Sequence, residues 1–154
     1  MSLYPWFEAL EATPVGDGIK ESVWLFPVIE SVHLLALAML GGAILMLDLR
    51  LLGLGLTSQK TSTVERAARP WLIGALLTMI VTGALLGTSE ALKLYDKQAF
   101  WVKMAALALA LVYTFAVQIP LASRDPRLLA KPLAVVSLGL WLTVAIAGRW
   151  IGFS

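Results

Sequence analysis

The sequence predicts an all-α integral membrane protein: a four-transmembrane-helix bundle with a short N-terminal amphipathic helix at the interface. The 154-residue chain is 59% hydrophobic and only 14% charged, whereas soluble domains carry about a quarter charged residues. Its mean hydropathy is +0.83. Four apolar runs reach the ~20 residues that a helix needs to cross the hydrocarbon core, and none shows the alternation of a barrel strand. We interpret residues 1–154 as a single membrane domain.

The elements follow from the pattern in chain order. A short interfacial helix is expected over about residues 3–12, because aromatic and leucine side chains stand there beside glutamates. The next stretch, TPVGDG, predicts a turn, since Pro14, Gly16 and Gly18 interrupt a regular helix. The four spans are then expected over about residues 20–52, 68–90, 98–121 and 132–152.

Proline and glycine positions bear on how these spans pack. Pro27 predicts a kink in the first span, because proline removes one backbone donor. Gly83 and Gly87 form a G-x-x-x-G pattern on the second span, for which we expect close helix packing. Gly41 and Gly42 on the first span are interpreted in the same way.

The basic residues predict the topology. The first and third loops together hold seven lysines and arginines, and the opposite side holds five at most. The positive-inside rule then places both loops in the cytoplasm and both termini outside. We therefore expect a multi-pass protein of the bacterial inner membrane with periplasmic termini. The short basic loops explain the net charge of +2, so the expected partners are the lipid bilayer and a homo-oligomer or larger membrane complex, and not nucleic acid.

Four ionisable residues fall in the half of the bundle nearest the termini: Glu30 and His33 on the first span, Lys103 on the third and Arg149 on the fourth. Charged groups inside a membrane are costly and usually functional. We therefore take these four as candidate cofactor-binding residues, with His33, the only histidine, as the metal ligand. Each also has a structural interpretation: an interhelical hydrogen bond for His33, snorkelling for Lys103, orienting His33 or pairing with Lys103 for Glu30, and interfacial anchoring for Arg149.

Haem b is the cofactor that this set predicts. Bundles build cofactor sites from inward-facing side chains, and imidazole is a common axial ligand of haem iron. Small residues around the ionisable groups on three spans favour a slot for a flat ligand, although they also favour tight packing. His33 would be the axial donor, and Arg149, Lys97 or Lys93 would hold the propionates. The sixth ligand would be Lys103, water or one of the methionines Met39, Met79 and Met104.

Other chemistries have little support, and no catalytic residue is predicted. The chain has no cysteine, which excludes disulfides, iron–sulfur clusters and thiol catalysis. One histidine and scattered methionines supply too few donors for zinc or copper held by protein alone. Gly53 and Gly55 follow a membrane helix rather than a strand, so they are no nucleotide fingerprint. Asp48 and Arg50, just beyond the continuous apolar run that ends at Leu47, are expected to form a salt bridge or cap at the cytoplasmic surface.

Three stretches carry a resemblance: IKESVWLFPVIESVHLLALAMLGGAILMLDLRLLGL, AFWVKMAAL and AGRWIGFS. With them the chain resembles a family of uncharacterised bacterial four-helix inner-membrane proteins. It is more weakly similar to HemJ-type protoporphyrinogen oxidases and to the CopD-like copper-resistance membrane domain. The HemJ likeness implies haem b binding by His33 and Lys103. The chain lacks the additional histidines of HemJ and has LDLRLLG at the end of the first span, so the likeness implies a haem or porphyrin pocket rather than the oxidase activity.

Three functions fit these residues, and the sequence leaves open whether the protein is an enzyme. The first is a haem b-binding protein that acts in electron transfer or as a HemJ-like oxidoreductase. The second is a non-catalytic subunit or scaffold, in which Glu30 and His33 make buried interhelical hydrogen bonds. The third is a small proton-linked transporter that uses Glu30, His33 and Lys103 as a relay.

Overall fold

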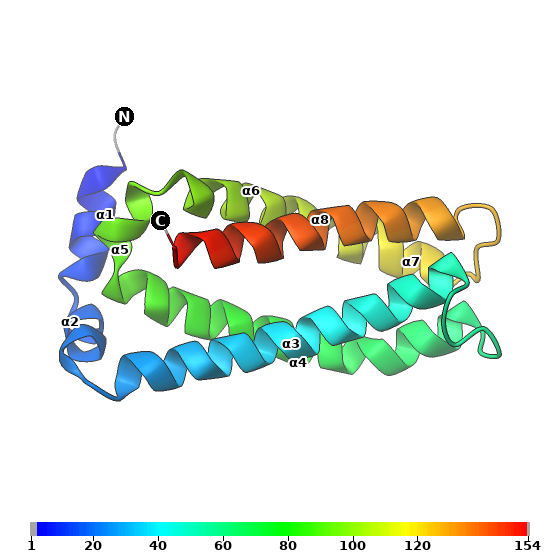
Figure 1. The fold of residues 1–154 in the computed structure, drawn as a ribbon, viewed down its shortest axis with the longest axis horizontal. Coiled ribbons are helices and arrows are strands. Elements are labelled where there is room, and N and C mark those ends of the chain that lie inside the picture. Colours follow the sequence, from blue (N-terminus) through cyan, green and yellow to red (C-terminus); the bar gives the residue numbers. More distant parts are fainter. Residues whose placement is uncertain (1–2, 154) are drawn as a thin grey trace.

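The computed structural model describes residues 3–153, and within that range it is helical without strands (Figure 1). Four stretches of helix are long and apolar enough to span a membrane, which confirms the predicted fold class and makes this a multi-pass membrane protein. They are α3 (Leu25–Leu52), α4 (Thr61–Ser89), the continuous stretch Gln98–Ala122 and α8 (Ala130–Ile151). The third is composed of α6 (Gln98–Tyr113), the π-helix η1 (Thr114–Gln118) and α7 (Ile119–Ala122).

Three short helices, α1 (Tyr4–Glu11), α2 (Pro14–Glu21) and α5 (Ala91–Tyr95), lie at one end of the bundle. The turn predicted at Pro14 is wrong, because α2 begins there. Proline suits the first position of a helix, where its missing N–H would have no partner, and the Gly16 N–H donates to Thr13 Oγ1 at 3.2 Å. A Cβ on Gly16 would lie 2.8 Å from the carbonyl oxygen of Glu11 and 2.9 Å from that of Thr88. Glycine therefore lets α2 lie directly against the end of α4.

The four spans form two pairs, α3 with α4 and α6 with α8 (Figure 1). Both chain ends and the short helices lie at one end, called here the terminal end; the α3–α4 and α7–α8 connections lie at the other, the loop end. The ribbons of α3 and α8 approach each other toward the loop end and separate toward the terminal end. A buried cluster joins the pairs in the loop half: Leu47, Leu51, Ala122, Leu133 and Ala134.

Proline and glycine act differently from the sequence-based expectation. Helix α3 begins at Leu25, so Pro27 lies in its first turn, where no helical hydrogen bond is lost and the reason for a kink does not hold. A Cβ on Gly41, Gly42 or Gly87 would meet nothing within 4 Å. Close packing at these three glycines is therefore wrong.

The π-helix η1 has a visible cause in the sequence. In an α-helix the ring of Pro120 would collide with the carbonyl group of Ala116, four residues earlier. The wider π turn removes this collision, and it places Thr114 and Gln118 inside the bundle, where both side chains are buried. Trp141 Nε1 donates to Thr114 Oγ1 at 3.1 Å and so ties η1 to α8.

Candidate functional site

His33 lies on α3 and faces α4. Its Nδ1 and Thr82 Oγ1 are 2.8 Å apart, and the Thr82 hydroxyl donates to the carbonyl oxygen of Thr78 at 2.7 Å. When the Thr82 hydroxyl donates to Thr78, its one hydrogen is used, and its oxygen accepts from the imidazole. In this tautomer His33 carries its proton on Nδ1, and Nε2 is the unprotonated nitrogen with a free lone pair.

Nε2 of His33 has no hydrogen-bond partner within residues 3–153. Every fully buried side-chain nitrogen or oxygen in that range has a hydrogen-bond partner, so Nε2, which has none, is not fully buried. Nε2 is therefore at least partly accessible. Metal-ligating histidines almost always donate their other ring N–H to a fixed acceptor, which sets the ring orientation. Thr82 supplies that acceptor here.

Glycine makes room for the imidazole. A Cβ on Gly83 would lie 3.3 Å from Cε1 of His33, closer than an ordinary contact. Gly83 therefore lets the ring lie against α4, next to the hydrogen bond with Thr82. The G-x-x-x-G pattern drew attention to Gly83, but its neighbour is an imidazole rather than another helix backbone.

Lys103 approaches from the other helix pair. It lies on α6, partly buried, with its stem along α8 where a Cβ on Gly148 would meet Cε at 3.5 Å and Nζ at 3.6 Å. Its ammonium group is near enough to act electrostatically on the His33 ring. No hydrogen bond or ion pair joins Lys103 to another residue in the described part of the chain. Of the four predicted residues, His33 and Lys103 are thus within electrostatic range of each other.

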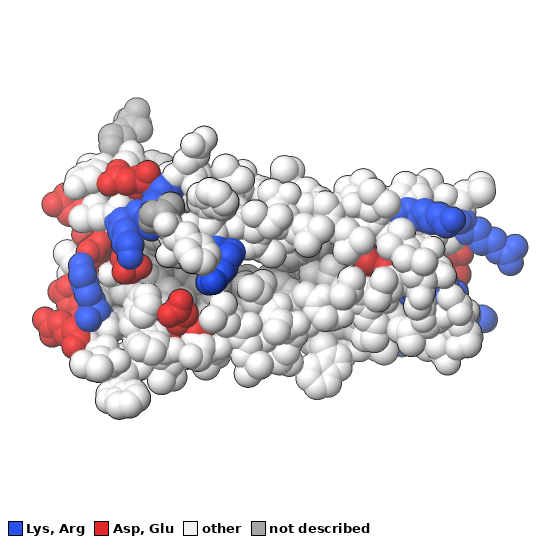
Figure 2. Space-filling model, in the orientation of Figure 1, with Lys and Arg blue, Asp and Glu red and all other residues white. Residues whose placement is uncertain are grey.

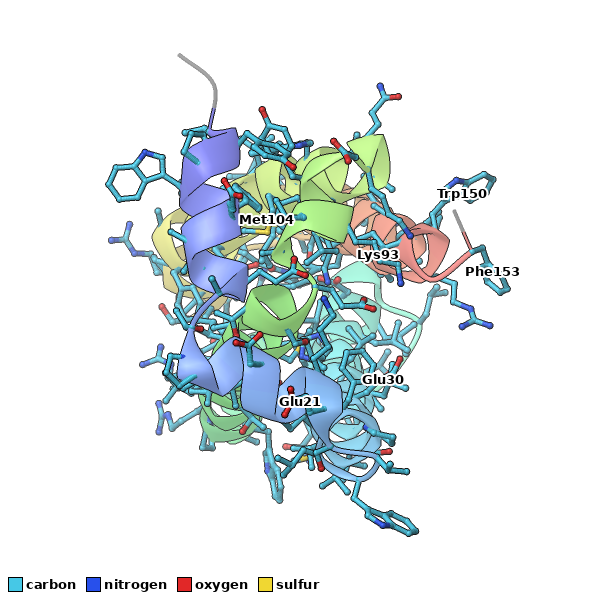
Figure 3. All side chains as sticks on the ribbon, turned by 90° about the vertical axis from the view of Figure 1, so that its left-hand side faces the viewer. Glu21, Glu30, Lys93, Met104, Trp150 and Phe153 are labelled. Carbon is cyan, nitrogen blue, oxygen red and sulfur yellow. The ribbon has the colours of Figure 1, made fainter. Side chains whose placement is uncertain are left out.

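Glu30 and Arg149 are exposed, and neither makes a hydrogen bond or ion pair with His33 or Lys103 in the described residues. Glu30 makes no hydrogen bond or ion pair with any residue between 3 and 153, so its expected pairing with His33 or Lys103 is wrong; Thr82 orients the imidazole instead. The Arg149 guanidinium lies over the Phe153 ring, 4.3 Å from its centroid. Figure 3 looks onto the terminal end and shows Glu30 on the same side of the molecule as Phe153.

A hollow opens between α3 and α8 near the terminal end, with one acidic and one basic side chain on its rim (Figure 2). Two of the three cations predicted to hold propionates have partners: Lys93 Nζ lies 3.0 Å from Glu90 Oε1, and Lys97 Nζ donates to the carbonyl oxygen of Ile151 at 2.8 Å. Arg149 is the remaining predicted cation at this end.

A second polar cluster lies in the loop half, where sequence reasoning placed no site. Asp48 is 0% exposed. Gln118 Nε2 donates to its Oδ1 at 2.5 Å, and Ser137 Oγ donates to its Oδ2 at 2.8 Å. The predicted surface salt bridge or cap is wrong, because α3 continues to Leu52 and turns Asp48 inward, while Arg50 Nε donates to the carbonyl oxygen of Gln59.

The donor set limits the kinds of metal centre. The described residues contain no group of three or more His, Asp or Glu side chains that would hold a metal ion. Zinc and copper sites need about that many protein donors, whereas haem iron needs one axial side chain. His33 with its free Nε2 could be the one side chain that haem iron needs, but it has too few neighbouring donors for a zinc or copper site.

A family model described as a family of unknown function (DUF6644) matches residues 7–154. This confirms the prediction of an uncharacterised family. No curated protein and no solved structure matches the chain, so the weaker likeness to HemJ-type oxidases and the CopD-like domain stays a prediction.

Proposed function

The chain belongs to the DUF6644 family, and we propose that it is a haem b-binding membrane protein with Nε2 of His33 as an axial ligand. The proposal depends chiefly on one observation. His33 Nδ1 lies 2.8 Å from Thr82 Oγ1, and when the Thr82 hydroxyl donates to Thr78 the imidazole presents the lone pair of Nε2, which has no partner among the described residues.

The surroundings of His33 suit a flat apolar ligand. The hollow lies where α3 and α8 separate, and glycine rather than a larger residue stands next to each polar group, Gly83 at His33 and Gly148 at Lys103. Arg149 at the terminal end would hold a propionate. Lys103 comes from the opposite pair and would be the second protein ligand of the iron.

Haem would supply one-electron redox chemistry. The chain's own residues would bind and tune it. Thr82 would accept the hydrogen bond from Nδ1–H, which would hold the ring orientation and raise the basicity of Nε2. Lys103 would bind the iron only as a neutral amine, because its ammonium form has no lone pair.

The proposed location is the bacterial inner membrane, with the terminal end in the periplasm. Seven of the twelve lysines and arginines belong to the loop end, and basic loops stay in the cytoplasm. The haem would then lie nearer the periplasmic surface and would exchange electrons on that side.

An absorption spectrum tests the proposal. The protein is purified in detergent from cells supplied with a haem precursor, and it is measured as isolated and after dithionite. We expect a Soret band, with α and β bands that sharpen on reduction. His33→Ala should lose them, and Ser31→Ala, at an exposed position on the same helix, should keep them. A wild-type protein without these bands, even after titration with haem, would refute the proposal.

The hydrogen bond between His33 and Thr82 also favours a second candidate, a non-catalytic scaffold in which this bond joins α3 to α4. His33→Asn separates the two functions, because the asparagine amide keeps a donor near the position of Nδ1 but has no Nε2. A haem protein loses its chromophore in this variant and stays folded. A scaffold has no chromophore to lose, keeps its assembly in His33→Asn and loses it in His33→Ala. The relay of a transporter gains no support, since Glu30 contacts neither His33 nor Lys103.

A further inference from the structure

Asp48 is the fully buried acid of the membrane-spanning core, and the haem proposal does not use it. Both of its carboxylate oxygens accept hydrogen bonds, one from Gln118 on η1 and one from Ser137 on α8. Both donors are neutral. The carboxyl group therefore links three of the helical segments without any formal positive charge in contact with it.

The charged and titratable groups around Asp48 have other partners. On its own helix, Arg50 donates to the carbonyl oxygen of Gln59. On α4, Glu65 pairs with Arg69 at 2.6 Å. On the third span, the Tyr113 hydroxyl donates to the carbonyl oxygen of Leu133 at 2.9 Å. On α8, Lys131 stands at the helix start, nearly two turns from Ser137. No ion pair within residues 3–153 includes Asp48.

A carboxylate without a cation in an apolar interior is strongly disfavoured, and such a group is neutralised instead. We propose that Asp48 is a proton-binding site, which takes up and releases a proton exchanged with water at the loop end of the bundle.

The hydrogen bonds can accommodate this proton. A proton on Oδ2 makes the carboxyl group a donor to Ser137 Oγ, whose own hydrogen must then turn to another acceptor. Serine hydroxyls in helices donate to the carbonyl oxygen three or four residues earlier. The oxygen of Leu133 already accepts from the Ser137 backbone N–H within α8 and from the Tyr113 hydroxyl, so the hydrogen turns to the oxygen of Ala134, which has a second lone pair. Gln118 continues to donate to Oδ1 in both states.

The same geometry disfavours a metal ion at Asp48. Cations need oxygen ligands that present lone pairs, but Gln118 presents its amide nitrogen and Ser137 its O–H group. Proton occupancy instead decides whether Ser137 donates to Asp48 or accepts from it. The hydrogen bonding between α3 and α8 therefore depends on the proton.

Infrared spectroscopy of the full chain in lipid nanodiscs tests this proposal. At about pH 6, where aspartates in water are ionised, the difference between the wild type and Asp48→Asn should contain the carbonyl band of a protonated carboxyl. The band should shift in D₂O and vanish as the pH rises. Absence of the band at pH 6 would overturn the proposal. Loss of the band at constant pH on adding Na⁺, but not on adding choline, would also overturn it, in favour of a cation site.

Ser137→Ala provides a second measurement if Asp48→Asn folds poorly. Removing a donor to the carboxylate weakens the ionised form, so the band should disappear at a higher pH than in the wild type. Thr143→Ala is the matched control, an exposed hydroxyl on the same helix that bonds only within α8, and it should leave the pH of the transition unchanged. An identical transition in Ser137→Ala and the wild type would refute the role of this hydrogen bond in proton binding.

Discussion

In the terminal half, His33 and Lys103 each have a nitrogen without a hydrogen-bond partner in residues 3–153, whereas in the loop half both oxygens of Asp48 accept hydrogen bonds. The two halves also differ in how tightly the helix pairs pack against each other. In the loop half a buried apolar cluster joins the two helix pairs, and in the terminal half a hollow separates α3 from α8.

The difference separates two ways in which a membrane bundle uses polar side chains. A satisfied buried group such as Asp48 leaves no room for a ligand larger than a proton, and its removal costs stability. A group with an unpartnered nitrogen, such as His33, leaves room for a ligand. Its removal should weaken ligand binding more than it lowers the stability of the fold. The following predictions test this contrast.

Asp48→Ala should have the largest effect on stability. It leaves the buried donors of Gln118 and Ser137 without an acceptor and creates a cavity, which together cost about 2–5 kcal/mol. The loss is measured as the free energy of unfolding in mixed micelles. His33→Asn, in the open half, should lose less than half as much. Equal losses in the two variants would contradict the contrast.

Gly16→Ala should have the second largest effect on the free energy of unfolding. The new Cβ would lie within 3 Å of two backbone oxygens, so α2 must move away from α4, at about 1–3 kcal/mol. Gly18 in the same helix is the control, because a Cβ there meets nothing within 4 Å. Gly18→Ala should be neutral or slightly stabilising. If both alanines behave alike, α2 does not pack on α4 as described.

Gly83→Ala should have a smaller effect on stability than Gly16→Ala. It should change haem binding at His33 rather than the folding of the chain. The Cβ, 3.3 Å from Cε1 of His33, must displace the ring by a few tenths of an ångström. We expect a shifted Soret band or weaker haem binding, and unfolding close to that of the wild type. Gly87→Ala, one turn further along α4 in open space, should leave the spectrum unchanged. A larger spectral change at Gly87 would place the imidazole elsewhere.

The smallest effect on stability should come from Asp125→Ala, at the surface of the loop end. Its carboxylate accepts from the backbone N–H and the hydroxyl of Ser62, each at 2.8 Å, and so caps the start of α4. These bonds lower the pKa of Asp125. Its contribution to stability is therefore present above the ordinary value of 3.8 and is lost as the pH falls below it. Asp125→Ala should slightly lower the unfolding temperature at pH 7 and have no effect at low pH.

The four spans could be predicted because the bilayer fixes both their length and their composition. The site could be predicted only in part. The depths of His33 and Lys103 follow from their distance along each helix, but the face that each residue presents depends on the rotation of neighbouring helices. For this reason Thr82 was missed as the partner of His33, and Glu30 was given a role that its exposed position does not allow.

Asp48 could have been found in the sequence. It follows the buried residues Leu40 and Ile44 at intervals of four, so continuing their stripe by one helical turn predicts that it faces inward. The end of the continuous apolar run at Leu47 favoured a surface position for Asp48 instead. Gln118 was not predictable in the same way, because its position depends on the π turn before Pro120.

The π turn divides the third span into two segments whose rotation about the helix axis is set by different contacts. At the start of the turn, Tyr113 and Thr114 make hydrogen bonds to α8. At its end, Gln118 donates to Asp48 on α3. A π turn accommodates one residue more than an α turn. Deleting one residue within 115–117 would remove that extra residue and return the ring of Pro120 to its collision with the carbonyl group four residues earlier. The number of residues in this turn is therefore itself under structural constraint, whatever side chains occupy it.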